Sequence, residues 1–321
     1  MRPIYLYLPV CVLGIPLLVG LLVASGQSDE STPPADANLQ LQKQVAKLDE
    51  ELGKSGHPLP DAAGMAQLAT HDPVAFLENC IRYYDRDVHG YHLIMQKQER
   101  VPTRLPIEKR KLQKKELIEV DFKEKPHSVF MHWLEGERLT DRCLYVEGEN
   151  DNMILVHPAG LAGKFVKFVK RKVDGPEAQE SGRYTLNMFG IKNGTLRTLS
   201  FAKKAKETGT LHMDYRGADG QWHDCGPEAT VSLGEEKVSQ AGNRSCYVLR
   251  RHYAEEENDG VLELKIFIDK ENWLQVGSIV EGKPEEPNGK RYLIGEYYFR
   301  DVRLNPQFSP DQFTESALAP K

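Results

Sequence analysis

Residues 261–269 read VLELKIFID, and their alternation decides the fold class. Side chains along a β-strand point in turn to the two faces of a sheet. Glu263 and Lys265 therefore lie on one face, and the opposite face carries four aliphatic residues: Leu262, Leu264, Ile266 and Ile268. A strand that is apolar on one side and charged on the other is typical of an antiparallel sheet with one buried face.

Short runs of the same kind occupy most of the chain. Each run ends in turn residues, and together they predict about ten strands: 91–101, 116–124, 128–134, 142–146, 152–156, 228–233, 245–253, 261–269, 273–280 and 292–302. Asp72-Pro73 predicts a helix start ahead of the strands, and a second helix at 195–207 interrupts them. Parallel strands would need a helix between every pair, so the pattern indicates an α+β protein with a single curved antiparallel sheet or open barrel.

The N-terminal segment differs from the rest of the chain. Residues 4–24 carry no charged side chain, and a helix of that length spans roughly 30 Å, the thickness of a bilayer core. Arg2 and the amino group favour a cytoplasmic N-terminus. The small residues at 23–26 also suit cleavage by a signal peptidase. Residues 1–26 are thus either a signal peptide or a single transmembrane anchor, and both predict export across the inner membrane.

A polar stretch with Pro33-Pro34 follows, and then one helical stripe of apolar residues: Leu41, Val45, Leu48 and Leu52. We interpret residues 27–64 as a polar tether and an amphipathic linker helix, and residues 65–321 as one folded domain. That domain is expected in the periplasm, free or anchored in the inner membrane and facing the periplasm.

The charge balance and the number of cysteines bear on the partners and the disulfides of the protein. Of 321 residues, 42 are Lys or Arg and 47 are Asp or Glu, which gives a formal net charge of -5. A nucleic-acid partner is not expected, because no basic excess is available to neutralise phosphates. In the exported part the cysteines are even in number, so disulfides are one option and four buried thiols are the other: Cys80, Cys143, Cys225 and Cys246. The pair with the shortest loop is Cys225 with Cys246.

Local catalytic motifs are absent from the sequence. It contains no Gly-x-Ser-x-Gly, His-Glu-x-x-His, Gly-x-Gly-x-x-Gly or phosphate-binding Gly-x-x-x-x-Gly-Lys-Ser/Thr pattern. We therefore predict no catalysis, no cofactor and no metal site.

Several C-terminal motifs resemble those of a known superfamily. Residues 267–270 (FIDK), 273–276 (WLQV) and 297–302 (YYFRDV), with Asn305 and Phe313, are similar to the closing pattern of bacterial outer-membrane lipoprotein carriers, the LolA/LolB-like superfamily. The stretch 72–320 also resembles an uncharacterised family of exported bacterial proteins, a domain of unknown function. The motifs that carry this second resemblance are Asp72-Pro73, EKP at 124–126, WLEG at 133–136, YVEGEND at 145–151 and SGRY at 181–184.

The resemblance to lipoprotein carriers implies an unclosed β-barrel with covering helices, whose concave face binds acyl chains. Removing acyl methylenes from water at roughly 0.8 kcal/mol each would supply the affinity without catalytic motifs. The helix at 195–207 would act as a lid. The residues expected to line the cavity are Val129, Met131, Trp133, Leu262, Leu264, Ile266 and Ile268. The same residues would otherwise make a filled core.

Two functions follow as hypotheses. The first is an exported, non-catalytic binding protein for lipid or lipidated protein in the bacterial cell envelope, tethered to the membrane if residues 1–26 are an uncleaved anchor. The alternative is a membrane-anchored interaction or sensor domain with a filled core and no lipid ligand. Bound lipid would distinguish them, and the sequence makes no prediction of oligomeric state.

Overall fold

A computed structural model describes residues 35–319, apart from 55, 102–104, 106–108, 138, 180, 258–259 and 284–288. The uncharged segment at 4–24 lies outside the described residues. Among the residues that are described, no helix has the length and apolar character needed to cross a membrane.

Thirteen strands of the described part form one sheet, and every pairing in it is antiparallel. The first six strands are β1 (Gly90–Glu99), β2 (Glu116–Lys123), β3 (Ser128–Glu135), β4 (Thr140–Val146), β5 (Met153–Pro158) and β6 (Val169–Lys172). The others are β7 (His212–Arg216), β8 (Trp222–Asp224), β9 (Glu236–Val238), β10 (Arg244–Glu257), β11 (Val261–Asp269), β12 (Gln275–Gly282) and β13 (Leu293–Leu304).

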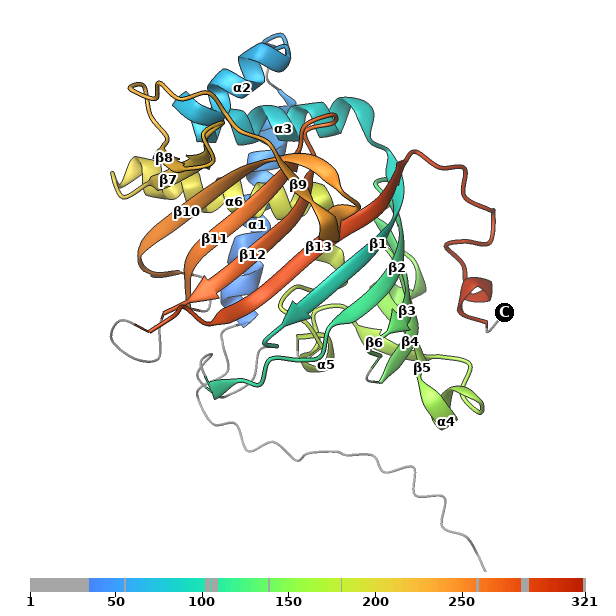
Figure 1. Cartoon of the computed structure of the whole chain (residues 1–321). Helices are drawn as coiled ribbons and strands as arrows, with labels where there is room; N and C mark the ends of the chain where they lie inside the picture. Colours follow the sequence, from blue (N-terminus) through green and yellow to red (C-terminus); the bar gives the residue numbers. More distant parts are fainter. Residues whose placement is uncertain are drawn as a thin grey trace, which may run out of the picture. The chain divides into compact units, whose positions relative to one another are not determined.

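The strand order is β6-β5-β4-β3-β2-β1-β13-β12-β11-β10-β7-β8, with β9 paired to β10. The first and last long strands, β1 and β13, therefore meet in the middle of the sheet. Within the described residues, β6 and β8 are free edges, so the sheet curves without closing (Figure 1). This confirms the predicted fold class of a single curved, unclosed antiparallel sheet with covering helices.

Helices cover one face of the sheet, which we call the inner face. They are α1 (Ala35–Gly53), α2 (Ala62–His71), α3 (Pro73–Asp87) and α6 (Ile191–Glu207). Beneath them, β7, β10 and β11 contribute inward-facing residues such as Leu249 and Ile266 to a shared apolar cluster with Leu196 and Leu199 of α6. In Figure 1, α1 and α6 pass behind β10, β11 and β12.

Sequence features explain where α3 begins and which face of α1 is buried. The side chain of Asp72 accepts a hydrogen bond from the Ala75 amide at 3.2 Å, which caps α3 one residue before Pro73. The apolar stripe of α1 is buried with residues of α3 and α6. Whether residue 65 begins a separate domain stays a prediction, but α1 packs on the same unit as the sheet.

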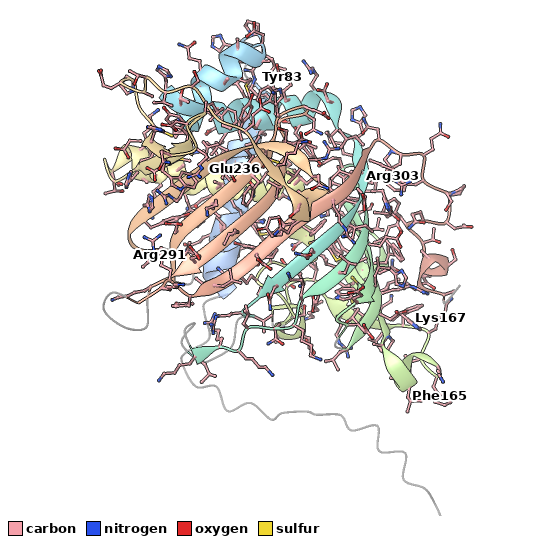
Figure 2. The ribbon with its side chains drawn as sticks, in the orientation of Figure 1. Tyr83, Phe165, Lys167, Glu236, Arg291 and Arg303 are labelled. Atoms are coloured by element: carbon pink, nitrogen blue, oxygen red, sulfur yellow. The ribbon has the colours of Figure 1, made fainter. Side chains whose placement is uncertain are left out.

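The opposite, outer face is covered in part by the C-terminal segment. Leu318, in the short helix η5 (Glu315–Leu318), packs against Phe130, Leu144 and Leu155 of β3, β4 and β5. The loop after α4 (Gly160–Gly163) instead projects beyond the sheet edge, where Phe165 is 86% exposed near Lys167 (Figure 2).

One predicted strand is wrong, and four short strands had no counterpart in the prediction. Residues 228–233 form no strand: they make one isolated antiparallel bridge, between Gly217 and Leu233, and Tyr215 Oη donates a hydrogen bond to the carbonyl of Val231. The strands β6, β7, β8 and β9 are three to five residues long, too short for alternation to be distinctive.

All four cysteines of the described part are free thiols. Burial raises the pKa of Cys143 and of Cys246 to about 12. Burial likewise raises the pKa of Cys80 and of Cys225 above the ordinary thiol value.

Candidate functional site

The residues predicted to line a cavity lie in two places. Val129 and Met131 of β3 are buried in the apolar cluster of β1 to β5, and Trp133 packs against it. Ile266 and Ile268 of β11 are buried beneath the helices, with Leu264 packed against them. Leu262 is half-buried. Their role in ligand binding stays a prediction.

Over β1 to β5, the inner face is covered by residues 173–179 and 181–190, which we call the cover segment. It contains α5 (Pro176–Gln179) and the short helix η3 (Leu186–Met188). Val173, Ala178, Leu186 and Phe189 bury their side chains in or against the cluster of β1 to β5. His127 Nε2 lies 2.9 Å from the carbonyl oxygen of Leu186, so the segment lies beside the turn between β2 and β3.

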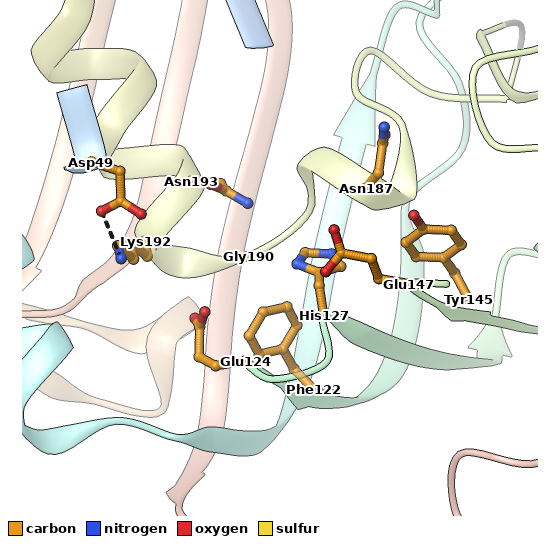
Figure 3. Close-up of a pocket in the computed structure, with 10 residues that line it drawn as sticks. All are labelled: Asp49, Phe122, Glu124, His127, Tyr145, Glu147, Asn187, Gly190, Lys192 and Asn193. Atoms are coloured by element: carbon orange, nitrogen blue, oxygen red, sulfur yellow. Dashed lines mark ion pairs between the residues drawn. The ribbon is translucent and has the colours of Figure 1, made fainter. Parts of the chain in front are cut away.

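A pocket of about 200 Å³ opens where the cover segment meets α6. The ends of β2 and β4, the turns after them, the start of α6 and Asp49 of α1 supply its walls (Figure 3). The lining residues are Asp49, Phe122, Glu124, His127, Tyr145, Glu147, Asn187, Gly190, Lys192 and Asn193. Phe122 and Tyr145 also belong to the buried cluster of β1 to β5, so the pocket has an apolar floor and a polar rim.

Ion pairs fix the side of the rim formed by α1, α3 and α6. Lys192 Nζ lies 2.7 Å from Asp49 of α1 and 2.6 Å from Asp85 of α3. Burial lowers the pKa of Lys192, but the hydrogen bonds and charges of the two carboxylates outweigh it, so its pKa is raised. Burial raises the pKa of Asp85 despite its contact with Lys192.

Aromatic groups complete the floor of the pocket. Tyr91 stacks on Phe122 with ring centroids 4.6 Å apart, and Phe122 meets His127 edge-on at 5.2 Å. Tyr84 Oη donates to Glu124 Oε1 at 2.5 Å. Burial, and then the nearby negative charges, raise the pKa of Tyr84 well above its ordinary value, so it remains a donor.

A second polar group, which we call the inner ion cluster, lies at the other ends of β1 and β2. Lys97 Nζ is 2.9 Å from Glu99 Oε1 and 3.2 Å from Glu116 Oε2, and all three side chains are nearly buried. Tyr297 Oη donates to Glu99 Oε2 at 2.5 Å. Burial raises the pKa of Glu99, but Lys97, the Tyr297 hydroxyl and Arg183 of the cover segment outweigh it and hold it below its usual value.

The sequence analysis named none of the pocket or inner-ion-cluster residues as site residues. The pocket residues come from segments scattered between positions 49 and 193, and no local motif connects them. The inner ion cluster did leave a signal. Lys97 and Glu99 follow Leu93 and Met95 at alternate positions, so the face that begins apolar ends in charges.

Residues 88–318 match the family model described as "Protein of unknown function (DUF1571)", so the chain belongs to this family. This confirms the resemblance to an uncharacterised family that was drawn from the sequence motifs. A search of the curated proteins finds no match.

Solved structures give remote similarities. A DUF1329 family protein from Desulfovibrio piger is 12% identical over 79% of this chain and 99% of its own, with a TM-score of 0.33. An uncharacterized conserved protein from Thermus thermophilus is 7% identical over 75% and 93% of the two chains, with a TM-score of 0.37. A LolA superfamily protein from Nitrosomonas europaea is 9% identical over 75% and 98%, with a TM-score of 0.28.

Proposed function

We propose that the protein is an exported, non-catalytic binding protein of the bacterial cell envelope, tethered to the membrane if residues 1–26 are an uncleaved anchor, and that its ligand is a lipid or a lipidated protein. One observation carries the proposal. The floor of the pocket is made by Phe122 and Tyr145, which belong to the apolar cluster beneath the cover segment. The pocket is thus a place where solvent reaches the inner apolar face.

The polar rim and the apolar floor suit the two ends of an amphipathic ligand. Lys192, Glu124 and Glu147 would contact a polar head group, and the acyl chain would enter between the cover segment and β1 to β3, along Val129, Met131 and Trp133. Each methylene removed from water contributes roughly 0.8 kcal/mol. The pocket of about 200 Å³ is smaller than the roughly 300–1,000 Å³ typical of ligand sites, so binding requires the cover segment to move outward.

The helix at 195–207, which was predicted to act as a lid, is part of α6 and is joined to its neighbours by ion pairs. Besides the two ion pairs of Lys192, α6 is joined to α3 by Lys203 with Glu78 at 2.6 Å and by Lys206 with Asp72 at 3.1 Å. We therefore assign the moving part to the cover segment rather than to the helix at 195–207.

The burial of the residues that were predicted to line the cavity supports a second candidate function. Val129 and Ile268 are 0% exposed and Ile266 is 1% exposed, so the inner face is already packed. This favours a membrane-anchored interaction or sensor domain with a filled core and no lipid ligand.

A photoactivatable fatty acid would test the first function. The full chain is expressed in bacterial membranes, irradiated with the probe and mapped by mass spectrometry. We expect cross-links in peptides that contain Phe122, Tyr145 or the cover segment. Cross-links confined to residues 1–34 would contradict a site in the domain and support the filled core.

Two exposed glutamates of one turn provide a matched pair of variants. Glu147→Trp places a ring at the pocket rim, whereas Glu149→Trp adds the same ring two residues away, at a position that does not line the pocket. Glu147→Trp should lower labelling at the pocket at least fivefold, and Glu149→Trp should leave it unchanged. Residues 1–34 are the same in both variants, so any lipid bound to that segment contributes equally to the labelling of both. Equal labelling of the two variants would place the ligand elsewhere.

A further inference from the structure

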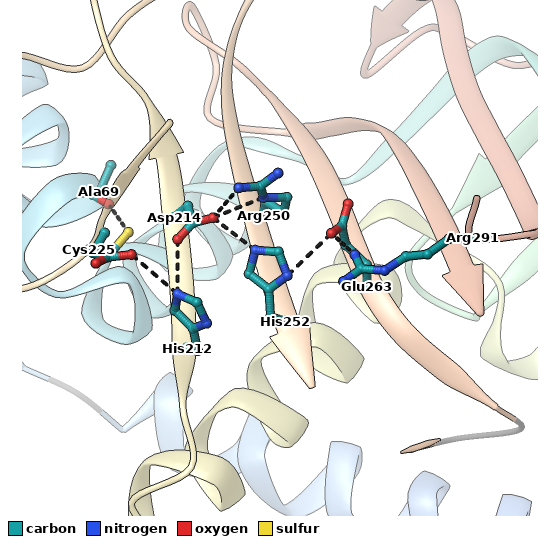
Figure 4. A network of polar contacts seen from close by, with 9 residues as sticks. Ala69, His212, Asp214, Cys225, Arg250, His252, Glu263 and Arg291 are labelled. Carbon is teal, nitrogen blue, oxygen red and sulfur yellow. Dashed lines mark hydrogen bonds and ion pairs between the residues drawn. The ribbon is translucent and has the colours of Figure 1, made fainter. Parts of the chain in front are cut away.

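A group of metal-ligating side chains lies on the outer face of the sheet, away from the pocket. His212 and Asp214 are alternate residues of β7, and His252 of β10 is paired directly opposite His212. Their ligand atoms all lie within 4.8 Å of one another. Figure 4 shows His212 and His252 on either side of the Asp214 carboxylate.

Each histidine lies about as far from the Asp214 carboxylate as two ligands of one metal ion lie from each other. His212 Nε2 is 3.2 Å from Asp214 Oδ1, and His252 Nε2 is 2.9 Å from Asp214 Oδ2. Zinc bonds of 2.0–2.1 Å at tetrahedral angles place neighbouring ligand atoms roughly 3.3 Å apart. The ligand atoms of the three residues lie within 4.8 Å of one another, so rotation of the side chains would bring all three groups onto one cation.

The two imidazoles are held in one orientation. Their rings lie 4.7 Å apart at an interplanar angle of 30°. His252 Nδ1 is 3.3 Å from Glu263 Oε2 on β11, and Arg291 in turn contacts Glu263. A carboxylate on the far nitrogen of a histidine ligand is the usual partner that fixes its tautomer in metal sites.

A fourth oxygen and a counter-charge complete the surroundings. Asp224 Oδ1 of β8 lies 3.2 Å from His212 Nε2, on a side chain that is 86% exposed and so can turn toward a cation. Arg250 donates to Asp214 Oδ2 through Nε at 2.9 Å. Oδ2 thus faces both Arg250 and His252, whereas Oδ1 faces His212, so each oxygen of the carboxylate lies beside one imidazole.

We propose that His212, His252 and Asp214 bind one divalent transition-metal ion of the zinc type, with Asp224 or water as the fourth ligand. Two imidazoles with one or two carboxylates suit Zn²⁺ and Co²⁺ better than the hard cations Ca²⁺ and Mg²⁺. The ion would join β10 to β7 and, through Asp224, to the edge strand β8.

Cobalt provides the direct test. The tag-free full chain is stripped with a chelator and titrated with Co²⁺ and then with Zn²⁺. We expect one equivalent of Co²⁺ to give the intense visible absorption of a tetrahedral site and Zn²⁺ to displace it. His212→Gln and His252→Gln should each weaken Zn²⁺ binding about 100-fold or more, and Glu263→Gln about 10–100-fold.

A histidine elsewhere on the outer face serves as the control. His92 Nδ1 pairs with Asp121 Oδ1 at 2.8 Å, and His92→Gln should leave Zn²⁺ affinity unchanged. His212 lies at the exposed edge, so His212→Gln remains informative even if His252→Gln impairs folding. Absence of one-to-one binding at micromolar Zn²⁺, or equal loss of affinity in His92→Gln and His212→Gln, would overturn the proposal.

Discussion

Replacing Glu99 by Gln tests whether the inner ion cluster stabilises the sheet beneath the cover segment. Glu99 and Lys97 are 2.9 Å apart and nearly buried. At an effective dielectric constant of about 20 their attraction is roughly 6 kcal/mol. Losing the carboxylate also removes its own desolvation cost and its repulsion of Glu116, and Lys97 keeps Glu116 at 3.2 Å. We therefore expect Glu99→Gln to lower the free energy of unfolding by about 3 kcal/mol at pH 7.

The sign of the pH dependence follows from the lowered pKa of Glu99. Because the folded pKa is below the ordinary value of 4.5, this stabilisation is fully present above about pH 4.5 and is lost as the pH falls through the folded pKa. The difference between wild type and Glu99→Gln should therefore narrow as the pH falls below about 4.5.

Urea unfolding at several pH values measures both effects. Glu119→Gln is the matched control, because Glu119 lies on the adjacent strand β2 with its side chain 37% exposed and 3.4 Å from His132. The control should stay within about 0.5 kcal/mol of wild type. A loss below 1 kcal/mol for Glu99→Gln, or a difference that does not narrow in acid, would refute the reasoning.

Three further predictions concern the core, a helix cap and the thiols. Ile268→Ala should cost about 3 kcal/mol in urea unfolding, because the side chain is fully buried beneath the helices; a loss below 1 kcal/mol would contradict tight packing there. Asp72→Ala should cost about 1 kcal/mol by thermal unfolding through loss of the α3 cap, and an unchanged stability would show that the cap is dispensable. In denaturant without reductant, iodoacetamide should alkylate Cys80, Cys143, Cys225 and Cys246 completely, and a disulfide-linked Cys225–Cys246 peptide would overturn the assignment of free thiols.

Local alternation made the long strands of the sheet predictable. The strand predicted at 261–269 has the same bounds as β11, because one of its faces is aliphatic at four alternate positions. In the structure, β10 and β12 pair with it on both sides. The edge strands were not predicted. In β7 the sequence HMDYR places His212 and Asp214 on one face and Met213 and Tyr215 on the other. Five residues are too few for this alternation to distinguish a strand from other local structures.

The candidate sites depend on contacts that the sequence does not encode locally. His252 is 38 residues beyond Asp214 along the chain, and only the pairing of β10 with β7 brings the two together. For this reason the sequence analysis predicted no metal site, whereas the fold places three ligand atoms together. The pocket is a similar case, because Asp49 and Lys192 meet only through the packing of α1 on α6.

The polar rim of the pocket and the inner ion cluster together limit the length of any acyl chain in the proposed lipid site. Between them, β1 contributes Tyr91, Leu93 and Met95, which pair with Phe122, Val120 and Ile118 of β2. From Phe122 at the pocket to Glu116 in the inner ion cluster is six residues, or roughly 20 Å of strand. Beyond that point the methylenes of a chain would displace the partners of buried charges, which costs more than their transfer from water contributes. The proposed ligand therefore has its head group at the rim of the pocket and an apolar part no longer than about 20 Å.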